Sequence, residues 1–136
     1  MKTRLDIIIS NFVIFLSLLF GTIFLGFFSK LIEYLSGLEK EFLSVIQIGI
    51  LGSIFSFFTY GILVWPVLMI FNIIIEFLGL RKEVSIYDCK KLFLYESIII
   101  ALFAILLSFK FDYYYWLFLI PIVLIGQFLR LKYLKK

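Results

Sequence analysis

The sequence predicts an all-α integral membrane protein with four transmembrane helices and both termini in the cytoplasm. Of its 136 residues, 64% are hydrophobic and only 16% are charged, whereas a soluble domain is about 45–50% apolar and about 25% charged. The charged residues fall in clusters, and the apolar segments between them are long enough to cross a bilayer, which takes about 20 helical residues. Lysine and arginine are concentrated in alternate clusters, which sets the orientation.

The first predicted span covers residues 6–30 and follows the segment Met-Lys-Thr-Arg. Its apolar run is longer than the 7–15 residues typical of a signal peptide, and no small-x-small cleavage site follows, so we expect it to be retained as a helix. In residues 30–41, Leu31, Leu35 and Leu38 are spaced like one face of a helix. The first helix is therefore expected to continue out of the membrane, to end near Gly37 and to lie partly in the outer interface.

The second predicted span, residues 42–79, meets no charge before Glu76. It is too long for one upright helix across a hydrocarbon core of about 30 Å. Because proline lacks an N–H and its ring clashes with the preceding turn, we expect this helix to be broken near Pro66.

The third and fourth predicted spans cover residues 92–109 and 113–131, and a cytoplasmic loop at 80–91 precedes them. Only Lys110, Phe111 and Asp112 separate the two spans, which predicts a tight antiparallel hairpin. Pro121 is expected to kink the fourth helix as Pro66 kinks the second. The whole chain, 1–136, is interpreted as a single integral membrane domain.

The distribution of basic residues favours four spans over five. With four spans, ten of the 13 basic residues are cytoplasmic, as the positive-inside rule requires. These ten are Lys2, Arg4, Arg81, Lys82, Lys90, Lys91, Arg130, Lys132, Lys135 and Lys136. Five spans would place the central loop and the tail outside.

The composition excludes most catalytic chemistry. The chain has no histidine, so zinc sites of the usual kind, bis-His haem ligation and His-based general bases are excluded. One cysteine allows no disulfide within the chain, and Cys89 is interpreted as a reduced bystander in the cytoplasmic loop. We therefore expect no enzyme, no cofactor and no metal. The net charge of +4 indicates contact with anionic lipid headgroups and not with nucleic acid.

Two carboxylates, Glu76 and Glu96, lie about four residues inside the cytoplasmic ends of their spans. An ionisable residue within a membrane is costly and often functional. At this shallow depth, structural pairing with a basic residue is the favoured interpretation, and a role in transport or recognition is the alternative. The basic residues within reach along the helices are Arg81, Lys90, Lys91 and Arg130.

Small and amide side chains predict helix packing within the membrane. Gly49 with Ser53, and Gly52 with Ser56, each place two small residues four apart on one helix face. Such faces let two helices approach closely, either within this chain or with a partner. The amides of Asn11, Gln47, Asn72 and Gln127 are expected to form hydrogen bonds between helices.

Tyr113, Tyr114, Tyr115 and Trp116 form an aromatic cluster at the start of the fourth span. Amphipathic rings favour the headgroup level, so this cluster is interpreted as part of an aromatic belt at the outer boundary. Contact with an external partner is the alternative.

The basic loop from Arg81 to Lys91 leads into Lys91-Leu92-Phe93-Leu94-Tyr95 and then into a span rich in Ile, Leu and Phe. This part of the chain resembles the small membrane immunity proteins that protect bacteria against pore-forming colicins and microcins. Its local sequence, a basic loop followed by a span rich in Ile, Leu and Phe, is similar to the colicin E1 type. Four spans with both termini inside are a feature of the colicin A type. The resemblance implies a protein of the bacterial inner membrane that binds the inserted helices of a toxin before its pore opens.

On this hypothesis the partner-binding candidates are the small and polar residues of the second span and the outer polar and aromatic residues. They are Gln47, Gly49, Gly52, Ser53, Ser56, Glu33, Glu39, Glu41, Tyr113, Tyr114, Tyr115 and Trp116. Two alternatives remain open: a small oligomeric transporter or flippase that uses Glu76 and Glu96, and an accessory subunit of a larger membrane complex. The expected partners are thus the bilayer, a pore-forming bacteriocin, a second copy of the chain or another membrane subunit.

Overall fold

The computed structural model describes the backbone of residues 2–59, 61–112 and 114–136, and the side chains of these residues except at 61–63, 114 and 115. It is an all-α protein with one minimal sheet. Four helical segments are long and apolar enough to cross a membrane among the residues described: Arg4–Leu35, Phe42–Thr59, Ile86–Phe111 and Trp116–Lys135. The predicted fold class is confirmed.

The chain divides into two compact units. Unit 1 comprises Met1–Leu18 and Val67–Lys136, and unit 2 comprises Leu19–Pro66. Each unit is described separately below.

The first helical segment consists of α1 (Arg4–Ile9) and α2 (Asn11–Leu35), which are interrupted at Ser10. Thr3 caps α1, since its side chain accepts from the N–H of Asp6 while the Asp6 carboxylate accepts from the N–H of Thr3. The helix continues past the predicted span, as expected. It ends at Leu35, and Gly37 follows with a φ of 75°, a left-handed conformation that glycine adopts without strain.

The second segment is more divided than its sequence suggests. It contains α3 (Phe42–Ile46), a π-helical turn at Gln47–Leu51, α4 (Gly52–Thr59) and α5 (Gly61–Gly79). Tyr60 lies outside the described residues. Pro66 lies inside α5, in its second turn, where a missing N–H removes a single bond near the start of the helix. The boundary between the two units in the sequence falls at this proline.

The predicted cytoplasmic loop 80–91 is too long, because α6 (Ile86–Phe111) begins six residues before residue 92. Ser85 caps this helix by accepting from the N–H of Asp88 at 3.1 Å. Cys89 therefore lies in a helix and not in a loop. Its side chain is buried with Ile7, Val84, Phe93 and Leu134 in an apolar cluster of unit 1.

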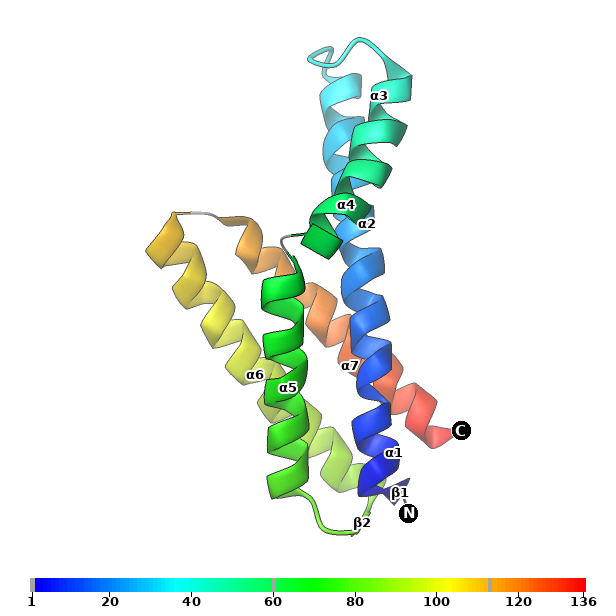
Figure 1. The fold of residues 1–136 in the computed structure, drawn as a ribbon, viewed down its shortest axis with the longest axis vertical. Coiled ribbons are helices and arrows are strands. Elements are labelled where there is room, and N and C mark those ends of the chain that lie inside the picture. Colours follow the sequence, from blue (N-terminus) through cyan, green and yellow to red (C-terminus); the bar gives the residue numbers. More distant parts are fainter. Residues whose placement is uncertain (1, 60, 113) are drawn as a thin grey trace. The chain divides into compact units, whose positions relative to one another are not determined.

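The helices that carry the predicted fourth span have different bounds from residues 113–131. A 3₁₀ helix at Tyr114–Phe118 precedes α7 (Leu119–Lys135). Pro121 is the third residue of α7, where a helix loses nothing by lacking an N–H, so it marks the start of the helix and does not kink it. The predicted hairpin is present: Asp112 ends α6 in the left-handed conformation, and α6 and α7 run antiparallel, side by side (Figure 1).

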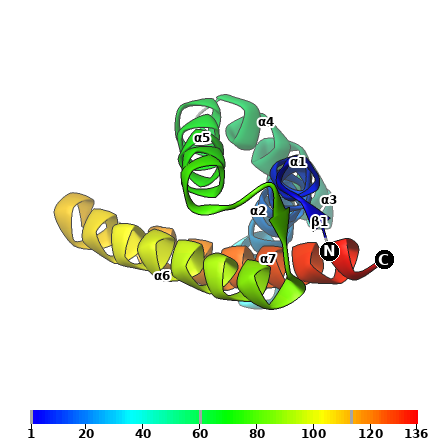
Figure 2. The same cartoon turned by 90° about the horizontal axis from the view of Figure 1, so that it is seen from below.

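A two-stranded sheet joins the N-terminus to the central loop, and the sequence did not predict it. β1 (Lys2–Thr3) pairs antiparallel with β2 (Glu83–Val84), as seen from below in Figure 2. Val84 also shares its buried cluster with Leu134, near the end of α7. Three parts of the chain expected on the cytoplasmic side thus meet at one end of unit 1.

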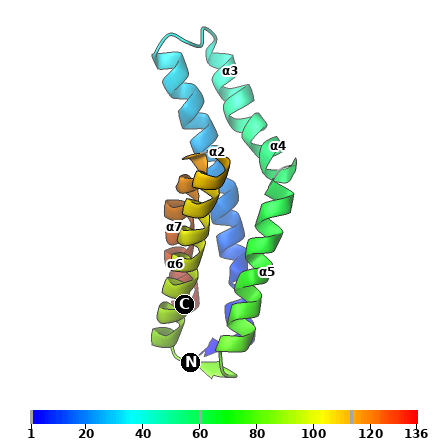
Figure 3. The ribbon, with the colours of Figure 1, turned by 90° about the vertical axis from the view of Figure 1, so that its left-hand side faces the viewer.

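Unit 2 is a helical hairpin. The end of α2 and the start of α3 lie side by side and are joined by residues 36–41 (Figure 3). The ring of Tyr34 meets that of Phe42 edge to face, with centroids 5.5 Å apart. Edge-to-face contact is a favoured geometry for aromatic pairs and stabilises the closure of the hairpin.

Candidate functional site

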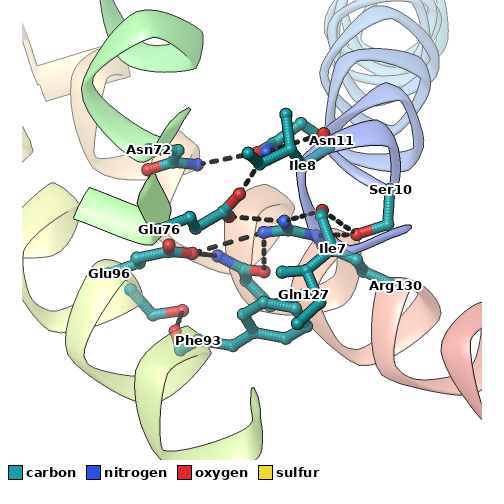
Figure 4. Close-up of polar contacts among 11 residues, drawn as sticks. Ile7, Ile8, Ser10, Asn11, Asn72, Glu76, Phe93, Glu96, Gln127 and Arg130 are labelled. Atoms are coloured by element: carbon teal, nitrogen blue, oxygen red, sulfur yellow. Dashed lines mark hydrogen bonds and ion pairs between the residues drawn. The ribbon is translucent and has the colours of Figure 1, made fainter. Parts of the chain in front are cut away.

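The most unusual feature of unit 1 is a buried group of charged side chains, which we name the ion cluster: Glu76 of α5, Glu96 of α6 and Arg130 of α7. All three side chains are 0% exposed. Arg130 lies between the two carboxylates and pairs with both (Figure 4). Of the four basic residues predicted to reach these carboxylates, Arg130 is the one that does so among the described contacts.

Each nitrogen of the Arg130 guanidinium donates hydrogen bonds to neighbouring acceptors. Its Nη2 donates to Glu76 Oε1 and, at 2.6 Å, to the carbonyl oxygen of Ile7. Its Nη1 donates to Glu96 Oε2 at 3.3 Å and to Gln127 at 3.4 Å. Arginine presents its N–H donors in a rigid planar fork, which allows one side chain to bind several acceptors at once.

The interruption between α1 and α2 supplies two of these acceptors. Ser10 lies between the two helices, and its hydroxyl accepts from Nε of Arg130 at 2.6 Å. The same hydroxyl donates to the carbonyl oxygen of Ile7 at 2.5 Å. On its other side the guanidinium carbon lies 4.0 Å from the centroid of the Phe93 ring, a cation–π geometry.

Three of the four predicted amides complete the cluster. Asn11 donates to Glu76 Oε2 at 2.8 Å, and Asn72 donates to the Asn11 side-chain oxygen at 3.5 Å. Gln127 donates to Glu96 Oε2 at 2.8 Å. Each bond links two different helices, as predicted.

Two buried oxygens of this region have no hydrogen-bond partner among the described residues: Glu96 Oε1 and Asn72 Oδ1. In addition, the cluster contains one cation and two carboxylates, so it carries a net charge of −1 when both carboxylates are ionised. Uncompensated charge in a low-dielectric environment is costly. The contacts of the cluster join the first helical segment to α5, α6 and α7. One carboxyl oxygen of Glu96 takes no part in them.

The other predicted partners of the carboxylates lie elsewhere. Arg81 and Lys90 are exposed. The Nζ of Lys91 lies 4.6 Å from the ring centroid of Tyr87. All three side chains are exposed, near the end of α5 and the start of α6.

In unit 2, the Gly49–Ser53 pair packs within the chain, which was one of the two predicted outcomes. Both residues are buried, and a methyl group added at Gly49 would lie 3.1 Å from the carbonyl oxygen of Gly26. A methyl group at Gly26 would come within 2.6 Å of the carbonyl oxygen of Gly49. The two helices therefore cross with their backbones in contact. The role of Gly26 was not predicted.

The second small pair has no such partner. Gly52 is half-buried and Ser56 is exposed. Among the described residues, a methyl group at Gly52 would contact only Ile48, in the preceding π-helical turn, at 3.8 Å. Gln47, at the start of the π-helical turn, is exposed. Its side chain forms no hydrogen bond among the described residues. Gln47 thus differs from the other three amides, which are buried in unit 1.

Two of the three carboxylates predicted to lie on the outer side, Glu33 and Glu39, are bonded locally. Glu33 pairs with Lys30 at 2.5 Å. Glu39 accepts from the Ser44 hydroxyl at 3.0 Å and from the N–H of Lys40 at 3.0 Å. The Ser44 hydroxyl and the neighbouring backbone N–H groups lower the pKa of Glu39. Glu41 is exposed.

Tyr113 and the side chains of Tyr114 and Tyr115 lie outside the described residues, so the predicted aromatic cluster is represented by Trp116, which is half-buried. No group of three or more Cys, Asp or Glu residues that could hold a metal ion is found in the described part of the chain.

The fold and its apolar helices define the class: a multi-pass α-helical membrane protein. Comparison with known proteins adds no narrower identity, since no family model, no curated protein and no solved structure matches the chain.

Proposed function

We propose that the protein is a binding protein of the bacterial inner membrane, of the immunity kind, that binds the inserted helices of a pore-forming toxin and prevents the pore from opening. The observation that carries this proposal is the position of Gln47. It is an exposed amide on a candidate span, and it begins a π-helical turn. Turns of this kind occur frequently at functional sites.

The exposure of Gln47 is unfavourable unless something binds it. An amide in an apolar environment costs free energy when its hydrogen bonds are unmade, and polar side chains in membranes associate with other helices for this reason. Gly52 and Ser56 follow on the same segment with little or no cover. Small residues at these positions permit close approach of a partner helix.

The transport alternative receives less support from the ion cluster. A coupling carboxylate has to exchange its ion with water, whereas Glu76 and Glu96 are 0% exposed and bonded by Arg130 and by amides. An accessory subunit would use the same surface around Gln47, but its partner would be another membrane subunit and not a toxin.

Protection of living cells tests the proposal. Cells that express the protein should survive the pore-forming toxin of its cognate locus, while cells with an empty vector should die. The variant Gln47→Leu keeps the size of the side chain and removes its hydrogen bonds, and it should lose most of the protection at an unchanged level of protein in the membrane.

The matched control is Ile48→Leu, which alters the neighbouring exposed side chain without changing any hydrogen-bonding group. It should protect as the wild type does. Equal killing of expressing and empty cells by the panel of cognate-locus toxins would refute the proposed function, and full protection by Gln47→Leu would refute the role of Gln47.

A further inference from the structure

The ion cluster has a feature that its structural role does not explain, namely its charge. Arg130 supplies one positive charge to two carboxylates, and all three groups are excluded from solvent. The carboxyl groups of Glu76 and Glu96 both bind the guanidinium of Arg130, which brings them close enough to interact with each other. Two ionised carboxylates repel at such a separation, whereas a proton between them forms a hydrogen bond.

The distribution of donors identifies the oxygen that is free to carry a proton. Both oxygens of Glu76 accept hydrogen bonds, one from Arg130 and one from Asn11. In Glu96, Oε2 accepts from Gln127 and Arg130, while Oε1 has no partner. A proton on Glu96 Oε1 would turn an unsatisfied buried acceptor into a donor, and Glu76 is the neighbouring carboxylate with which Glu96 interacts.

Among the described residues, the groups around the two carboxylates offer no second positive charge. The charged or titratable groups are Arg130 from α7 and the Cys89 thiol from α6, which interacts electrostatically with Arg130 and Glu76. The remaining contacts are neutral: the Ile7 carbonyl, Ser10, Asn11, Asn72, Phe93 and Gln127.

We propose that Glu76 and Glu96 together bind one proton at neutral pH, held on Glu96 Oε1 and donated to Glu76, so that the cluster with Arg130 is electrically neutral. The site is a proton-binding site of unit 1, and the inference is independent of the proposed function. The proton is taken up from water when the helices assemble, and it is released to water when they separate.

Infrared spectroscopy of the purified wild-type protein in lipid vesicles tests this directly. At neutral pH the spectrum should contain the carbonyl stretching band of a protonated carboxylic acid, and the band should shift in heavy water. The other seven of the nine Asp and Glu residues are exposed or half-buried, so they should be ionised under these conditions. Glu96→Gln should abolish the band, and Glu41→Gln, at an exposed carboxylate, should leave it unchanged.

The stability of the protein provides a second measurement. A folded state that holds one proton more than the unfolded chain loses stability as the pH rises. The unfolding equilibrium constant of the wild type should rise about tenfold per pH unit while that difference persists. In Glu96→Gln, which carries the neutral form permanently, this dependence should disappear.

If Glu96→Gln does not fold, the wild type decides the question. A protonated carboxyl band that disappears at alkaline pH together with the loss of stability supports the proposal. Absence of the band from the folded wild type at neutral pH overturns it, and so does a band that persists in a folded Glu96→Gln variant.

Discussion

At the scale of single residues, Arg130 shows what the sequence can and cannot predict. The pairing of Glu76 and Glu96 with a basic residue follows from the cost of burying a charge, and this prediction is confirmed. Which of the four basic residues forms the pair depends on how α6 and α7 are rotated about their axes. The spacing of residues along the sequence does not determine this rotation. The acceptors on Ile7 and Ser10 depend on the interruption between α1 and α2, and no glycine or proline marks this interruption in the sequence.

Arg130→Met should strongly destabilise the protein. It removes the cation and leaves two carboxylates buried at 0% exposure, and breaking one side of a buried ion pair costs about 3–5 kcal/mol. The free energy of unfolding in detergent, measured by denaturant titration, should fall by about this amount. Lys132→Met changes the charge equally at an exposed position and should stay within about 0.5 kcal/mol of the wild type. Equal stability of the two variants would contradict the structural role of the cluster.

At the scale of helices, the sequence predicts four long apolar segments, and the structure contains four among the residues described, but it does not predict where the helices begin and end. Ser85 followed by Asp88 is a capping pattern that the sequence displays, and it places the start of α6 at Ile86 instead of at residue 92. Pro121 was interpreted as a kink although proline is favoured in the first turn of a helix. The π-helical turn at Gln47–Leu51 has no sequence signature known to us, because it arises from how the backbone accommodates one extra residue.

The crossing of helices in unit 2 depends on Gly26 and Gly49, where the two backbones are in contact. Gly52 lies outside this contact. Gly26→Ala should destabilise unit 2, because the added methyl group would meet Ser53 and the carbonyl oxygen of Gly49, and overpacking costs about 1–3 kcal/mol. Gly52→Ala places its methyl group 3.8 Å from Ile48. It should be neutral or stabilising by up to about 1 kcal/mol, because alanine favours the helix.

Both glycine variants can be compared by thermal unfolding in the same detergent, and each serves as the other's control. A Gly26→Ala protein as stable as Gly52→Ala would show that the close approach of these two helices contributes little to the fold.

At the scale of the whole molecule, unit 1 supports an even number of crossings. Lys2–Thr3 pairs with Glu83–Val84, and Val84 shares a buried cluster with Leu134. The N-terminus, the central loop and the end of α7 therefore lie at one end of the unit. If this end of the unit lies on one side of the membrane, the chain crosses an even number of times between residues 3 and 83 and again between residues 84 and 134. That is the pattern expected of the four spans deduced from the positions of the basic residues.

This topology predicts which positions can be labelled from outside the cell. In a Cys89→Ala background, which removes the single native thiol, cysteine can be introduced as Leu38→Cys, Lys82→Cys or Lys135→Cys. A membrane-impermeant maleimide added to intact cells should label the protein that carries Leu38→Cys, since Leu38 is 82% exposed in the loop between α2 and α3. The other two should react only after the membrane is permeabilised, because the positive-inside rule predicts a cytoplasmic position for these ends of the helices, which carry ten of the 13 basic residues. Labelling of Lys82→Cys but not of Lys135→Cys in intact cells would contradict an even number of crossings between these positions, whereas labelling of both without Leu38→Cys would reverse the orientation and keep the fold.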